Sequence, residues 1–328
     1  QRADVPEDDP RRARGWTISA HTRILEGELD EADRALGSAR EVIECTDDDA
    51  LEAEWYRIRA KLAYDRGQFD DARSLYQRSV DLHDSLDDDE GLAMALQGLA
   101  SVGRSTGDYR SSVDAYRRAI SLFEDTEQDL GSCSSLYGLA DALRRLGELD
   151  DARDCLSRAL GGFEEYGLRF GQAHAMNLLG EIARQQGELE AAEGHYRDAS
   201  ELMRQLHAGD QPIVQVNLAL VLLERGRWQK AGALLTRVLW ELANRGETGF
   251  EIAVHAALVP CMAHAALWEN FDTHLERTEE LARETGIVEQ DVARVLTLAA
   301  DAASQASEHE RADRARKLAE AQSADIVG

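Results

Sequence analysis

Apolar residues recur along the chain at the spacing of one face of an α-helix. Between Leu29 and Ala39 they fall 3, 4 and 3 residues apart, directly after a glycine. A similar stripe from Leu136 to Leu143 precedes Gly147. Since a helix turns once every 3.6 residues, both stripes predict helices packed on one side. The sequence therefore predicts units made of a helix, a glycine turn and a second helix.

This unit is repeated along the chain. The stretch GELDEADRAL at 27–36 returns as GELDDARDCL at 147–156. The glycine recurs at intervals of 40 or 39 residues, at Gly27, Gly67, Gly107, Gly147, Gly187 and Gly226. Residues five and twelve positions after it, and seven before it, are mostly small, whereas those two and nine after it are large. Such agreement over six copies indicates a repeat architecture.

Each column of the repeat has a physical role. Glycine adopts a left-handed conformation at little cost, so it can end the first helix. Acidic residues such as Asp30 and Asp150 follow, where the positive end of the second helix dipole favours them. Small residues let the two helices approach closely, and large ones fill the space beside them.

The columns become weaker toward the C-terminus. We expect a disordered segment at 1–12, six well-formed units at 13–246, two degenerate units at 247–322 that act as a C-terminal cap, and a tail at 323–328. Acidic runs such as Asp81–Glu90 are interpreted as connectors between units.

These columns resemble the tetratricopeptide repeat (TPR), from about Ala13 to Gln322, with units of about 40 residues as in kinesin light chains, LGN-type polarity adaptors and bacterial multidomain regulators. The proline that often closes a TPR unit is absent throughout. The resemblance implies an all-α fold, a right-handed superhelical solenoid of antiparallel helix pairs with about eight repeats. It also implies a concave face, lined by the first helices, that holds peptides, helices or domains of other proteins.

Composition narrows the partners. The formal net charge is -26, which disfavours nucleic acid and anionic membrane surfaces as partners. The four cysteines are scattered, as expected for free thiols in a reducing compartment, and no stretch of 18 apolar residues occurs. We therefore expect a cytoplasmic protein without membrane or nucleic-acid contacts. Because the sequence begins at Gln1, we expect it to be a piece of a larger protein.

Motifs for catalysis are missing. The sequence contains no P-loop, no HExxH, no zinc-type Cys/His cluster and no GxSxG. The acidic stretch Asp84–Gly91 lacks the alternation of a calcium loop. We expect neither an enzyme nor a cofactor or metal in this chain.

By the TPR resemblance, first-helix residues outside the packed stripe face the groove. The candidates for binding a peptide or partner are Arg57, Lys61, Tyr64, Gln97, Arg104, Tyr137, Arg144, Asn177, Arg184 and Asn217. Arg104, Arg144 and Arg184 recur at 40 residues and are expected to form a ladder that pairs with acidic groups of a peptide. The amides of Asn177 and Asn217 could hold a peptide backbone. The alternative is that the arginines only bridge to acidic residues of neighbouring units.

Two C-terminal segments, 213–223 and 250–268, are apolar nearly all round. Such helices are buried on several sides, so a thick core beneath the cap is the simplest interpretation. A ligand pocket opened by a kink at Pro260, or a face for self-association, is the alternative.

The sequence thus favours a non-catalytic protein-interaction or sensor module of a larger intracellular signalling or regulatory protein, with an acidic peptide or partner domain in the groove. One alternative is a sensor of a small molecule or signal peptide that uses the apolar C-terminal units. Another is the regulatory segment of an enzyme whose catalytic domain lies elsewhere.

Overall fold

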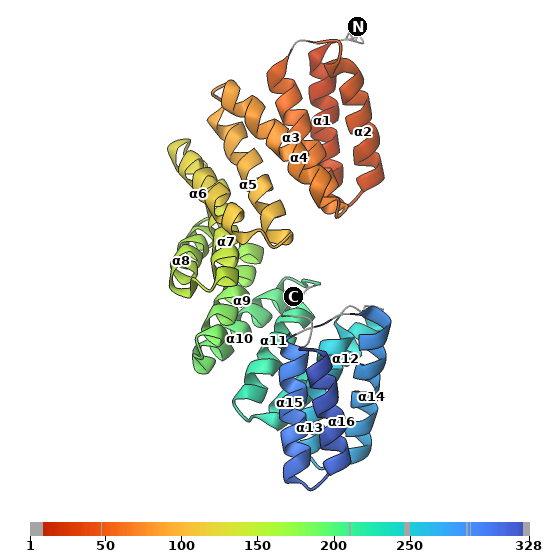
Figure 1. The fold of residues 1–328 in the computed structure, drawn as a ribbon. Helices are drawn as coiled ribbons and strands as arrows, with labels where there is room; N and C mark the ends of the chain where they lie inside the picture. Colours follow the sequence, from red (N-terminus) through yellow and green to blue (C-terminus); the bar gives the residue numbers. More distant parts are fainter. Residues whose placement is uncertain are drawn as a thin grey trace. The chain divides into compact units, whose positions relative to one another are not determined.

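Every regular element in the described part of the chain is an α-helix. The computed structural model describes residues 9–46, 48–209, 211–245, 250–286, 288 and 290–323. The described helices form eight pairs joined by short turns, and they divide after Leu168 into two compact units (Figure 1).

In each pair the odd-numbered helix is the first. Unit 1 contains α1 (Pro10–Leu25), α2 (Leu29–Ile43), α3 (Asp49–Asp65), α4 (Phe69–Ser85), α5 (Asp89–Ser105), α6 (Tyr109–Asp125), α7 (Asp129–Leu146) and α8 (Leu149–Glu165). Unit 2 contains α9 (Arg169–Gln185), α10 (Leu189–Gln205), α11 (Gln211–Glu224), α12 (Trp228–Arg245), α13 (Glu251–His264), α14 (Trp268–Thr285), α15 (Gln290–Gln305) and α16 (His309–Ala321). The all-α architecture of repeated helix pairs expected from the sequence is confirmed.

The turn inside each pair has a residue with positive φ. The predicted glycines occupy it in six pairs, with φ between 68° and 83°: Gly27, Gly67, Gly107, Gly147, Gly187 and Gly226. In the two degenerate pairs Ala266 (φ 54°) and Ser307 (φ 65°) take the same conformation. The two degenerate pairs therefore keep the conformation of the turn without a glycine, at the steric cost that a Cβ adds.

Two expected boundaries differ from the structure. Helix α1 begins at Pro10, inside the segment expected to be disordered, because Asp9 caps it by accepting a hydrogen bond from the Arg11 amide and proline suits a first helical turn. The expected connector Asp81–Glu90 is mostly helical, since only Leu86–Asp88 separate α4 from α5. Residues 1–8 and 324–328 of the expected end segments, and 246–249 at the expected start of the cap, lie outside the described residues.

Buried tyrosines lie directly on glycines of a neighbouring first helix. Tyr116 of α6 is 2% exposed, and its ring and hydroxyl lie where a Cβ on Gly138 of α7 would be, only 2.4 Å away. The same arrangement joins Tyr76 to Gly98 in unit 1. In these pairs a missing side chain on one helix makes room for a large one on the next.

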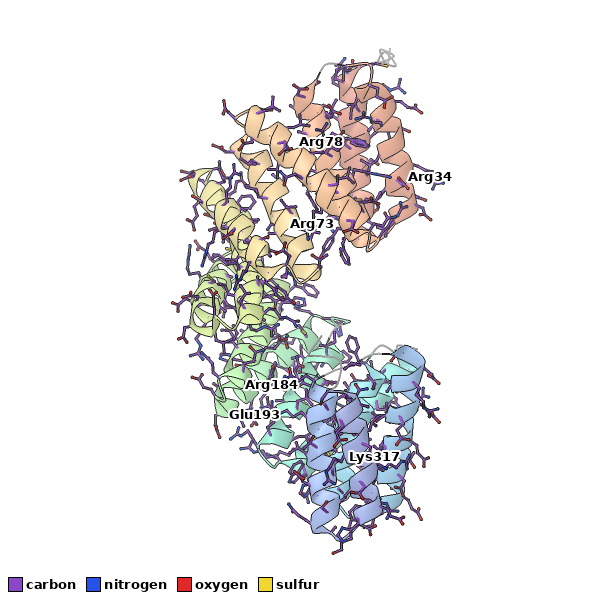
Figure 2. All side chains as sticks on the ribbon, in the orientation of Figure 1. Arg34, Arg73, Arg78, Arg184, Glu193 and Lys317 are labelled. Atoms are coloured by element: carbon purple, nitrogen blue, oxygen red, sulfur yellow. The ribbon has the colours of Figure 1, made fainter. Side chains whose placement is uncertain are left out.

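Buried ion pairs connect successive helix pairs. Glu193 of α10, labelled in Figure 2, is 3% exposed. It accepts hydrogen bonds from Arg197, Arg225 and Arg227. Arg225 and Arg227 flank the glycine turn of the next pair, so the carboxylate ties α10 to the α11–α12 turn. In unit 1, Asp33 of α2 binds Arg66 (2.7 Å) in the same position before its glycine.

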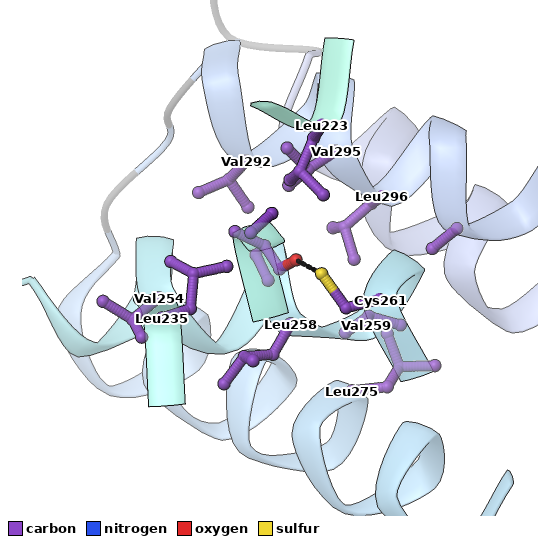
Figure 3. Packing of buried hydrophobic residues seen from close by; sticks show 14 of the residues in the cluster. Leu223, Leu235, Val254, Leu258, Val259, Cys261, Leu275, Val292, Val295 and Leu296 are labelled. Carbon is purple, nitrogen blue, oxygen red and sulfur yellow. Dashed lines mark hydrogen bonds between the residues drawn. The ribbon is translucent and has the colours of Figure 1, made fainter. Parts of the chain in front are cut away.

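The apolar C-terminal segments form a core. Helices α11 and α13 pack among α12, α14 and α15, and Val254, Leu258, Leu223 and Leu296 are at most 1% exposed (Figure 3). Helix α13 continues through Pro260. The burial supports the interpretation of these segments as a thick core.

The contact between Gly138 and Tyr116 makes a stability prediction. Gly138→Ala forces the buried Tyr116 ring to move, so the free energy of unfolding measured by urea denaturation falls by about 1–3 kcal/mol. Gly161→Ala is the matched control, because Gly161 lies in α8 with open space around it. There, alanine's higher helix propensity stabilises by up to about 1 kcal/mol. Equal stabilisation by both substitutions would contradict the packing.

Candidate interaction face on the first helices

The predicted binding residues all lie on first helices. Arg144 is buried and the other nine are partly buried. By helix they are Arg57, Lys61 and Tyr64 on α3, Gln97 and Arg104 on α5, Tyr137 and Arg144 on α7, Asn177 and Arg184 on α9, and Asn217 on α11.

On α3 the cations have local partners. Arg57 donates two hydrogen bonds to Glu54 (2.8 and 2.5 Å), and Lys61 binds Asp65 (2.6 Å). The Tyr64 hydroxyl lies 2.8 Å from the Ser105 hydroxyl, which links α3 to α5. This end of unit 1 is therefore a polar surface of short-range pairs.

Asp141 on α7 collects three arginines, a group that we call the Asp141 cluster. Its carboxylate lies 3.0 Å from Arg104, 2.7 Å from Arg144 and 3.9 Å from Arg145. Burial would raise the pKa of Asp141, but Arg144 and Arg104 outweigh it and hold the pKa below its usual value. The cluster thus shows arginines from two repeats arranged around one carboxylate.

Arg104 is positioned by the packing beneath it. The buried Tyr116 hydroxyl lies 3.0 Å from the Ser101 hydroxyl, and Tyr116 interacts electrostatically with Arg104. Burial lowers the pKa of Arg104, but Tyr116 and Asp141 outweigh this effect and keep the pKa above its usual value. The guanidinium is therefore charged and oriented.

In unit 2 a second group, the Arg184 network, joins α9, α11 and α15. Arg184 donates to both oxygens of Asp291 (2.8 Å each) and to Glu224 (3.2 Å). Glu224 also binds Arg294 (3.2 Å). Two of the four residues are acidic and two basic, so the network is electrically balanced.

The two predicted amides meet on the same face of α9 and α11. Asn217 donates to the side-chain oxygen of Asn177 (3.2 Å), and Asn177 donates to Glu181 (3.1 Å). The two amides therefore lie together.

Each predicted arginine has an acidic partner in the chain. Arg104 and Arg184 bridge to another repeat, as the alternative expected. Arg57 and Arg144 pair with acidic residues of their own helices. The role of the predicted residues in binding stays a prediction. The acidic partner Asp291, 107 residues from Arg184, was missed because repeat periodicity carries no signal of it.

Other kinds of site are scarce in this part of the chain. Among the described residues, no group of three or more His, Cys, Asp or Glu side chains could hold a metal ion. The helices that could be searched include none long and apolar enough to cross a bilayer.

The helix pairs and their glycine turns define a tetratricopeptide-repeat protein. More specifically, the chain belongs to the MalT-like TPR region family, whose model matches residues 53–247. None of the curated protein sequences matches the chain.

Several solved structures share the fold. A Rap protein complexed with Competence and Sporulation Factor is 13% identical, with a TM-score of 0.65 over 97% of this chain and 99% of that chain. The apo quorum sensor NprR from B. thuringiensis is 13% identical, with a TM-score of 0.71 over 94% and 87%. A STAND protein with a tetratricopeptide repeat sensor from Pyrococcus horikoshii is 16% identical, with a TM-score of 0.59 over 83% of this chain and 40% of that chain. At these identities the similarity concerns the fold.

A histidine pair in unit 2 should make stability depend on pH. The Nδ1 atoms of His255 and His274 lie 2.9 Å apart between α13 and α14. Burial, together with His274 and Arg277, lowers the pKa of His255 to about 4, and burial lowers the pKa of His274. Unfolded histidines titrate near pH 6.5, so between pH 6.5 and 4 the unfolded chain binds more protons than the folded one.

Stability should therefore be full above pH 6.5 and fall as the pH drops toward 4. His255→Asn removes part of this loss, by about 1 kcal/mol at pH 5 after allowance for partial solvent exposure. The measurement is urea denaturation at pH 7 and pH 5. His309→Asn, at an exposed position of α16, should leave the loss unchanged. An equal pH dependence in wild type and His255→Asn would contradict the role of the pair.

Proposed function

We propose that this chain is a non-catalytic interaction module of a larger intracellular signalling or regulatory protein, and that it binds an acidic peptide or partner segment on the first-helix face. The observation that carries the proposal is the Asp141 cluster, where Arg104, Arg144 and Arg145 surround one carboxylate. Arginine pairs with carboxylates through a planar fork of donors, so the cluster has the chemistry to receive acidic groups.

Exposure allows a ligand to reach this cluster. The side chain of Arg145 is 54% exposed and that of Arg104 is 30% exposed, whereas Asp141 is 14% exposed. An incoming carboxylate therefore meets arginines at the surface of the cluster.

The solved structures of the same fold support a binding or sensing role. One was determined with Competence and Sporulation Factor, another is a quorum sensor, and a third carries a repeat sensor. Recognition of a partner or signal is also the class of function that we propose for this chain. With a net charge of -26 the chain as a whole repels acidic ligands, so their binding must depend on a local cluster of cations.

The test removes the resident carboxylate of the cluster. Asp141→Asn frees arginine donors for a ligand, so the affinity for fluorescein-labelled decaglutamate in 0.15 M salt should rise about fivefold, measured by fluorescence anisotropy. The same substitution leaves buried arginines short of a partner, so the free energy of unfolding should fall by about 3 kcal/mol.

The opposite signs separate binding from structure. Asp154→Asn, on the exposed face of α8, makes the same change in net charge and should alter neither quantity. Arg104→Gln should weaken binding of the peptide. Decaglutamine is the uncharged probe and should not bind. If Asp141→Asn and Arg104→Gln leave the affinity for decaglutamate unchanged, the proposed function is wrong.

A second candidate function, sensing of a small apolar molecule, is favoured by a cavity in unit 2. The cavity measures about 690 Å³ and lies between α12 and α13, beside the turn that follows Pro260. The Trp228 indole stacks on His264 with centroids 3.8 Å apart, and Met262 and Cys261 line the cavity. Burial raises the pKa of the Cys261 thiol to about 12, so it lines the cavity as an unreactive apolar group.

This volume fits a small ligand with a flat apolar part. We expect 2-naphthoate to bind in isothermal titration calorimetry. Its flat apolar rings suit the aromatic wall of the cavity, and its carboxylate suits the exposed cation Lys230. Ala233→Trp fills the cavity and should weaken binding at least tenfold. Ala243→Trp, exposed on the same helix, should not. Equal affinities for both variants would exclude the cavity as the site.

A further inference from the structure

The first-helix face of unit 2 already holds a carboxylate. Asp291, in the first turn of α15, accepts two hydrogen bonds from Arg184 of α9 at 2.8 Å each. This two-oxygen geometry is the one in which arginine binds acidic side chains of other proteins. The pairing with Asp291 thus shows that Arg184, labelled in Figure 2, binds a carboxylate.

The position of α15 makes this contact. In the preceding pairs of unit 2 the second helix packs against the first helix of the following pair. Helix α10 packs against α11 in this way, and α12 packs against α13. Helix α15 instead lies mainly on α13, through buried residues such as Val292 and Leu296, and it also meets α11. The N-terminal turn of α15 therefore reaches the face where α9 and α11 present their inner side chains.

The core of α15 holds the helix in place, whereas its acidic group is accessible. Val292 and Leu296 are at most 1% exposed, but the side chain of Asp291 is 36% exposed. Arg294, one turn along α15, is 58% exposed and binds Glu224. The Arg184 side chain is 16% exposed, so a carboxylate from solvent can reach it when the Asp291 side chain turns away, without displacement of α15.

We infer that Arg184 is a carboxylate-binding position which the chain occupies with its own Asp291, and that an acidic peptide segment binds there by replacing this side chain. The inference rests on the proposed function and adds its regulation in unit 2. Asn177 lies seven residues before Arg184, on the same face of α9, so a segment anchored at Arg184 can extend along the amides of Asn177 and Asn217. In the free protein the Asp291 carboxylate keeps Arg184 paired. A ligand therefore binds at Arg184 only if its interaction there is stronger than that of Asp291.

The experiment removes the competitor and leaves its shape. In the full chain Asp291→Asn should raise the affinity for fluorescein-labelled decaglutamate about fivefold in 0.15 M salt, measured by fluorescence anisotropy. Arg184→Gln added to Asp291→Asn should abolish this gain. Asp291→Glu keeps the carboxylate and should give no gain. Circular dichroism and urea denaturation of each variant establish that it is folded.

Asp301→Asn is the matched control, because Asp301 is an exposed aspartate on the same helix and its loss changes the net charge equally. A gain that is equal in Asp301→Asn and Asp291→Asn would overturn the inference, as would a gain that survives Arg184→Gln. The Asp141→Asn variant reports on the cluster in unit 1. A response to Asp141→Asn without one to Asp291→Asn would therefore reject the inference alone, and the absence of both responses would reject the proposed function as well.

Discussion

The structure depends on the close approach of neighbouring helices. Glycine and alanine columns permit this approach, and buried aromatic rings fill the space beside them. Tyr116 shows how far this constraint extends. Its ring occupies the space over Gly138, and its hydroxyl emerges next to Ser101 and Arg104. The packing between α6 and α7 thus places a polar atom that affects the electrostatics of a guanidinium on the first-helix face. The side chains available for recognition are therefore positioned by the same contacts that hold the repeats together.

Charge pairing is the second constraint. A chain with net charge -26 has more carboxylates than it has cations, so buried arginines find acidic partners within the fold. Glu193 holds three arginines at a joint between helix pairs, and Asp141 holds three on the first-helix face. The motif is shared, and the two carboxylates differ in exposure: the side chain of Glu193 is 4% exposed and that of Asp141 is 14% exposed. Each cluster also includes an exposed arginine, Arg197 at 62% and Arg145 at 54%, so the exposure of the arginines does not distinguish the two clusters.

The repeat could be predicted from the sequence because its signals are local. The six glycine turns lie where the columns placed them, since glycine is the residue least strained at positive φ. The turns between pairs gave no such signal. Asp87, Glu127 and His207 take positive φ there without a glycine, at the 40-residue spacing, whereas Gly167 and Gly286 take it in two other described turns between pairs. Tertiary packing imposed a conformation on those turns that residue preferences do not encode.

The candidate face was predictable only in part, for a related reason. Periodicity places Arg104, Arg144 and Arg184 on first helices, and the structure does so too. Their partners depend on neighbouring repeats and on the path of the final pair, so Asp141 as a shared acceptor and Asp291 as a distant one could not be read from spacing. The acidic run Asp81–Glu90 has the charge expected of a connector, but charge does not fix where a helix ends. Helices α4 and α5 extend into the run.

Resident carboxylates have a consequence for selectivity. A buried arginine without a partner is costly, so a face of empty arginines would destabilise the free protein. Under the proposed function, a ligand at Asp141 or at Asp291 exchanges one carboxylate for another, and its net gain is a difference between two similar pairs. One acidic group then gains little, whereas a segment that carries several groups at the right spacing adds their gains within a single binding event. Under the proposed function, the same pairing that stabilises the repeats therefore favours extended acidic partners over small anions.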